Sequence, residues 1–140
     1  MKRAIVTAAA AALALTGCSS GPDEAEKYDD VNDLRAAIDS AGIQCQWRTP
    51  NVYPARVQGM YFCTDDNGAK SYVVNYESTE DMYARLDQYI GDARWQTDIT
   101  AIVVGNEWTV ECTNEKACKP FAQALGGNMR LAPEFKSSEE

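Results

Sequence analysis

The sequence predicts an α+β fold, a small two-layer domain in which an antiparallel sheet of about four to five strands packs against three helices. Two pairs of strand-like segments are each separated by a tight turn, which makes neighbouring strands antiparallel. Three further segments repeat apolar residues with helical spacing. Four cysteines follow the first 20 residues, and this even number suggests that two disulfides hold the domain together.

The chain opens with a segment that has the layout of an export signal. Lys2 and Arg3 precede an apolar stretch from Ala4 to Leu15. This stretch is shorter than the roughly 20 residues that span a bilayer, so it indicates a signal peptide and not a transmembrane helix.

The end of this segment, Leu15-Thr16-Gly17-Cys18, resembles the lipobox of bacterial lipoproteins. The resemblance implies cleavage between Gly17 and Cys18, and attachment of diacylglycerol to the thiol of Cys18. A plain signal peptide with an incidental cysteine is the alternative. We therefore expect a signal peptide over residues 1–17, a flexible tether over 18–28, the α+β domain over 29–133 and an acidic tail over 134–140.

Composition limits the classes of partner. The 140 residues are 45% hydrophobic and 24% charged, which is typical of one globular domain. The formal net charge is −8, and loss of Lys2 and Arg3 with the signal peptide makes it more negative. An acidic surface argues against nucleic acid and against adsorption to anionic lipid headgroups.

The first helix is expected to begin at Asp29 or Asp30, which can cap it, and to end before Gly42. Val31, Leu34 and Ile38 are the residues that it would bury. A weak strand, Gln44-Cys-Gln-Trp-Arg-Thr49, follows, and then a loop rich in proline.

Two stronger strands, 56–64 and 70–76, flank Asp65-Asp66-Asn67-Gly68. Asn-Gly tolerates positive φ and predicts a hairpin turn. The two aspartates also permit a calcium-loop interpretation, but the alternating ligands and the distal glutamate of such a loop are missing.

The second helix is expected to be capped by Ser78 and closed by Gly91, with Met82, Leu86, Tyr89 and Ile90 on its buried face.

A second hairpin is predicted over 99–112, turning at Gly105-Asn106. Alternation in its second strand predicts that Trp108, Val110 and Cys112 are buried, whereas Thr109 and Glu111 face solvent. A last helix is expected over Pro120-Phe-Ala-Gln-Ala-Leu125, with proline in its first turn and Gly126-Gly127 as its stop. All three helices are expected on one face of the sheet.

With Cys18 assigned to lipid, the remaining cysteines can pair in three ways. Short loops favour Cys45–Cys63 and Cys112–Cys118. A zinc site is the alternative, but the chain has no C-x2-C spacing and no histidine. We expect disulfides, and neither a metal site nor a cofactor.

No catalytic motif is found in the sequence. It lacks histidine, G-x-S-x-G, S-x-x-K and a phosphate-binding glycine loop. We therefore predict that the protein is not an enzyme. The aromatic residues near the first hairpin could fill the core or form a binding surface, and both interpretations stay open. Arg94 and Trp95, which lie in a polar link, are the candidate residues for binding a partner.

Beyond the lipobox, the chain is similar in outline to small disulfide-bearing envelope lipoproteins of actinobacteria and their phages. The resemblance implies a lipid-anchored protein on the extracytoplasmic face of the cell membrane, which binds an envelope protein or another macromolecule or has a structural role. A prophage lipoprotein that excludes other phages, and an inhibitor of a secreted enzyme, are the two alternative functions.

Overall fold

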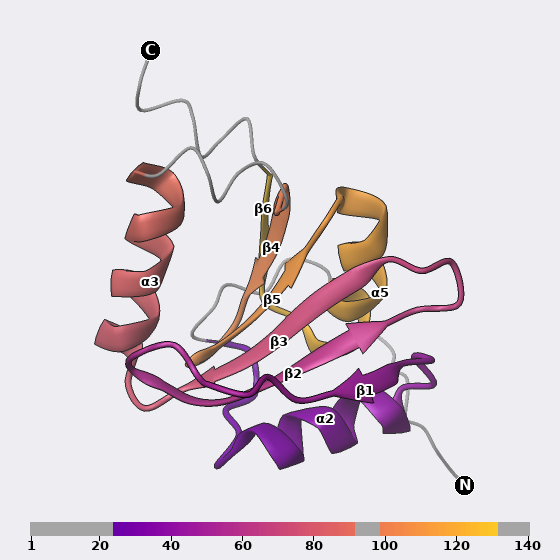
Figure 1. Cartoon of the computed structure of the whole chain (residues 1–140), viewed down its shortest axis with the longest axis horizontal. Coiled ribbons are helices and arrows are strands. Elements are labelled where there is room, and N and C mark those ends of the chain that lie inside the picture. Colours follow the sequence, from indigo (N-terminus) through magenta and orange to yellow (C-terminus); the bar gives the residue numbers. More distant parts are fainter. Residues whose placement is uncertain (1–23, 92–98, 132–140) are drawn as a thin grey trace, which may run out of the picture.

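The computed structural model describes residues 24–91 and 99–131, which form one antiparallel sheet and three helices (Figure 1). The strand order across the sheet is β1-β2-β3-β5-β4-β6. The predicted α+β class is confirmed, with one strand more than the upper end of the prediction. The elements, in chain order, are α2 (Val31–Ser40), β1 (Gln46–Arg48), β2 (Val57–Thr64), β3 (Lys70–Tyr76), α3 (Thr79–Gly91), β4 (Ala101–Val104), β5 (Trp108–Cys112), α5 (Glu115–Leu125) and β6 (Asn128–Leu131).

The helices cover both faces of the sheet, so the expectation that they share one face is wrong. Helices α2 and α5 pack on one face, where Leu34, Ile38 and Phe121 join the larger apolar cluster. Helix α3 packs on the other face, where Met82 and Leu86 join a second cluster, and Figure 1 shows it apart from the other two helices. The physical reason is that the central strands β3, β4 and β5 are largely buried on both faces, so each face needs a cover.

Helix α2 begins as predicted. The Asp30 side chain accepts a hydrogen bond from the Asp33 backbone N–H at 3.0 Å, and Val31, Leu34 and Ile38 are the buried residues. After the helix, Gly42 adopts φ +84°, which glycine tolerates best.

The β2–β3 hairpin closes through Asp65. Its Oδ1 accepts hydrogen bonds from the backbone N–H groups of Asn67 and Ala69 at 2.8 and 2.9 Å, and Gly68 has φ +84°. One carboxylate oxygen of the supposed calcium loop is therefore occupied by its own turn.

The β4–β5 hairpin turns at Gly105 as predicted, but the burial of β5 differs from the prediction. Every residue of β5 is buried, including Thr109 and Glu111, which were expected to face solvent. Alternation correctly placed these two side chains on the face opposite Trp108 and Val110, but the alternation could not reveal that α3 covers that face.

The last helix starts five residues earlier than the Pro120 start predicted from the sequence. Asn114 caps α5 by accepting a hydrogen bond from the Ala117 N–H at 2.8 Å, and Pro120 lies inside the helix. Cys118, Phe121 and Leu125 form its buried stripe. The Asn114 cap and this buried stripe together determine where α5 begins. The helix therefore contains Pro120 and does not start at it.

Strand β6 was not predicted. Gly126 ends α5 with φ +79°, and Gly127, with φ +93°, directs the chain back along β4. A Cβ at Gly127 would lie 2.7 Å from the Val104 carbonyl oxygen, so the close approach of the two strands requires glycine.

Candidate functional site

The sequence-predicted site residues fall into two groups. Gly17, Cys18, Arg94 and Trp95 lie outside the described residues. The four remaining cysteines form the predicted disulfides, Cys45–Cys63 and Cys112–Cys118. One bridge joins the segment beside the edge strand β1 to β2, and the other joins α5 to β5.

Residues 24–28 were assigned to the flexible tether, and this assignment is wrong for them. Ala25 is buried, and the Glu26 carbonyl oxygen accepts a hydrogen bond from the Trp108 indole N–H at 2.8 Å. Lys27 pairs with Glu107 at 3.2 Å, and the Tyr28 ring lies 6.3 Å from that of Trp108. This contact could not be predicted from the sequence, because the segment is polar and binds mainly through its backbone.

A buried polar network is centred on Glu111, whose side chain is fully buried. Arg85 of α3 binds both carboxylate oxygens, with Nε 3.2 Å from Oε2 and Nη2 3.1 Å from Oε1. The hydroxyls of Thr109 and Tyr76 donate to Oε2 at 3.0 and 3.3 Å. This bidentate geometry compensates for the desolvation of both charges and fixes α3 on the sheet.

The network perturbs Tyr76. Burial of its hydroxyl, together with the nearby charge of Glu111, raises the pKa of Tyr76 far above its usual range. Tyr76 therefore remains protonated and acts as a hydrogen-bond donor to the carboxylate. This geometry suits a structural role, because such a phenol is a poor general base.

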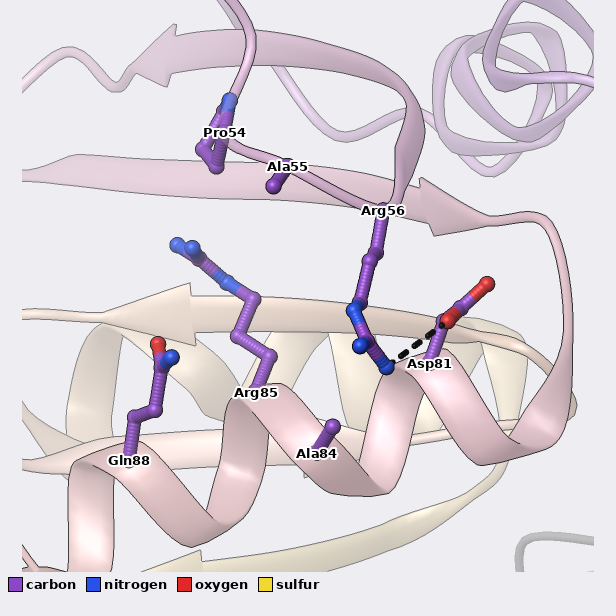
Figure 2. Close-up of a pocket in the computed structure, with 7 residues that line it drawn as sticks. All are labelled: Pro54, Ala55, Arg56, Asp81, Ala84, Arg85 and Gln88. Carbon is purple, nitrogen blue, oxygen red and sulfur yellow. Dashed lines mark hydrogen bonds and ion pairs between the residues drawn. The ribbon is translucent and has the colours of Figure 1, made fainter.

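A cavity of about 270 Å³ lies next to this network, between α3 and the loop before β2. Arg56 reaches from the loop to Asp81 on α3, with Nη1 3.4 Å from Oδ1, whereas Arg85 rises from α3 toward the loop (Figure 2). Both arginines that line the cavity are thus paired with carboxylates. This pairing leaves both arginines little capacity to bind a further anion. The Arg56–Asp81 ion pair at the cavity therefore serves to connect the loop to α3.

The network was missed in the sequence analysis because its members are far apart in the chain. Glu111 pairs with Arg85 across 26 positions and with Tyr76 across 35. The one local signal of the network is an acidic residue within a strand whose other positions are apolar or Thr. A strand at the exposed edge of a sheet shows the same pattern, so the pattern does not identify a buried carboxylate.

The described part of the chain contains no group of three or more Cys, Asp or Glu residues that could hold a metal ion. None of its helices is both long enough and apolar enough to cross a lipid bilayer. Comparison with known protein families, curated proteins and solved structures finds no match to this chain.

Proposed function

We propose that this protein is an exported, lipid-anchored lipoprotein of the bacterial envelope, and that its domain binds a macromolecule without catalysing a reaction. The observation that carries the proposal is Leu15-Thr16-Gly17-Cys18 at the end of a basic and then apolar leader. Two acyl chains on one cysteine provide the two hydrophobic anchors that stable membrane attachment requires.

The two disulfides support an extracytoplasmic location. Disulfides form and persist in oxidising compartments and are rare in the cytosol. Cys63, Cys112 and Cys118 are buried, so their bridges belong to the folded core. When Cys18 is assigned to the lipid, the other four cysteines are all accounted for by the two disulfides.

The docked segment at residues 24–28 supports attachment close to the membrane. Ala25 is already buried in the domain. The residues between Cys18 and Ala25 reach at most about 25 Å when fully extended. A lipid on Cys18 would therefore keep the β4–β5 turn, to which residues 25–27 bind, near the bilayer surface.

The buried polar network does not offer a general base. The carboxylate of Glu111 is saturated by Arg85, Thr109 and Tyr76. A general base needs a free lone pair within reach of a substrate, and this fully buried group lacks such access.

The proposal is tested by replacing the lipid acceptor. In cells fed labelled palmitate, we expect the wild-type chain to carry label and the Cys18→Ser variant to carry none and to accumulate as precursor. Ser19→Ala is the matched control, because it changes the neighbouring residue and leaves the thiol. Label that persists in Cys18→Ser would disprove the assignment.

A further inference from the structure

We propose that the sheet face on β1, β2 and β3 that α3 leaves uncovered binds an anionic saccharide chain. This surface, the open sheet face, consists of Gln46, Arg48, Phe62, Thr64, Lys70 and Tyr72. The inference rests on the proposed function, because it supplies the ligand class for the exported domain.

Strand register brings these residues together. Arg48 is opposite Phe62, and Phe62 is opposite Tyr72. In the neighbouring row Gln46 is opposite Thr64, and Thr64 is opposite Lys70. Side chains of directly opposed residues lie about 5 Å apart, so the six form one continuous surface of two rows.

Helix α3 covers only part of this side of the sheet. Met60, on the same face of β2, is buried in the cluster with Met82 of α3. Farther along β2, Phe62 and Thr64 are half-buried, and Arg48 and Lys70 are exposed. The surface is hollowed by a cavity of about 580 Å³, which is lined by Gln46, Arg48, Thr49, Pro50, Asn51, Phe62, Thr64 and Lys70.

The charge of the hollow is opposite to that of the whole protein. The chain has a formal net charge of −8, yet among the described residues no acidic side chain lines this cavity. Arg48 and Lys70 form no ion pair with another described residue. The carboxylates nearest to Lys70 in the sequence, Asp65 and Asp66, line a different hollow beside α5. Two unpaired cations in an acidic domain therefore favour an anionic ligand.

The neutral side chains indicate a saccharide as the carrier of this charge. The Phe62 and Tyr72 rings lie 5.1 Å apart and are half-buried, so they offer an apolar platform for the face of a sugar ring. Gln46, Thr49, Asn51 and Thr64 add amides and hydroxyls that exchange hydrogen bonds with sugar hydroxyls. Nucleic acid offers rings and charge as well, so tighter binding of a nucleic acid than of a charged saccharide is the outcome that would contradict this choice of ligand.

The test is binding of polygalacturonate to the processed full chain in detergent, measured by calorimetry. We expect binding that weakens with added salt, and no binding of the neutral polymer dextran. Arg48→Ala/Lys70→Ala should weaken binding by roughly tenfold, since each exposed charge contributes a few-fold. Nuclear magnetic resonance should also show that polygalacturonate shifts the ring signals of Phe62 and Tyr72.

The matched control is Lys116→Ala/Lys119→Ala, which removes the same charge from exposed positions on α5, a helix that packs on the other face. We expect its affinity to stay within about twofold of wild type. The proposal is overturned if wild type does not bind, if dextran binds equally, if both double variants lose the same affinity, or if oligothymidylate binds more tightly than polygalacturonate. Palmitate labelling reports on Cys18 alone, so failure of the anchor and failure of the saccharide site are distinguished.

Discussion

Glu111 shows how tertiary packing changes the role of a residue. Its position in an alternating strand predicts solvent exposure, yet its side chain is fully buried. The charge is tolerated because Arg85 approaches from α3 and binds both carboxylate oxygens. The sequence correctly predicted the face of β5 that carries Glu111, whereas its partner could not be predicted.

This pairing predicts an unequal response to the loss of two arginines. Arg85→Met should lower the free energy of unfolding by about 3–5 kcal/mol, because it leaves the Glu111 charge buried and uncompensated. Urea denaturation measures the change. Arg56→Met is the control, because it removes an arginine whose side chain is 61% exposed and should cost at most about 1 kcal/mol.

The double variant Arg85→Met/Glu111→Leu refines this prediction. Replacing both charges by apolar groups should recover much of the lost stability, since no buried charge then remains. Equal losses for Arg85→Met and Arg56→Met would show that the Glu111 network does not hold α3 on the sheet.

At the scale of elements, α5 shows how two sequence signals compete. Proline at position 120 suggested a first turn, whereas Asn114 six positions earlier is the cap that the helix uses. Cys118 contributes to the choice, because its bridge to Cys112 places this position against β5. Pro120 is therefore the sixth residue of the helix. Because proline has no backbone N–H, the Lys116 carbonyl oxygen does not receive the helical hydrogen bond that residue 120 would otherwise donate.

The observed start of α5 predicts opposite effects at its two ends. Pro120→Ala should raise the free energy of unfolding by about 1–2 kcal/mol, since it restores a helical donor. Asn114→Ala should lower it by about 1 kcal/mol, because the cap to Ala117 is lost. Thermal unfolding measures both. A helix that began at Pro120 would instead leave Asn114→Ala neutral and gain nothing from Pro120→Ala.

At the scale of the whole molecule, the sheet joins two apolar clusters, and the disulfides reinforce one side of it. Both bridges lie in the cluster covered by α2 and α5. The Cys45–Cys63 bridge also holds the three-residue edge strand β1, which carries Arg48 of the open sheet face. A strand this short depends on such a connection, because few backbone hydrogen bonds hold it.

Removal of this bridge is therefore expected to weaken the whole domain. Cys45→Ala/Cys63→Ala should lower the free energy of unfolding by about 3 kcal/mol, as expected for a loop that closes over 18 residues. Chemical denaturation under oxidising conditions measures the loss. A loss below about 0.5 kcal/mol would show that β1 and its loop are held by other contacts.

The sequence by itself determined the local features of this protein. The cap at Asp30, the turn at Asp65 and the stripe of Val31, Leu34 and Ile38 were predictable, because each depends on residues a few positions apart. The disulfide pairing was predicted on the same basis of short loops. The leader, whose end resembles a lipobox, is also a local pattern, and the proposed location rests on it.

Only the tertiary structure decided the long-range features. It placed α3 on the second face of the sheet, buried Glu111 against Arg85, docked residues 24–28 and added β6 beside β4. Each of these depends on free energy gained between segments far apart in the chain, and local patterns contain no term for that gain. The open sheet face is of the same kind, since register alone brings Arg48, Phe62 and Lys70 into one surface.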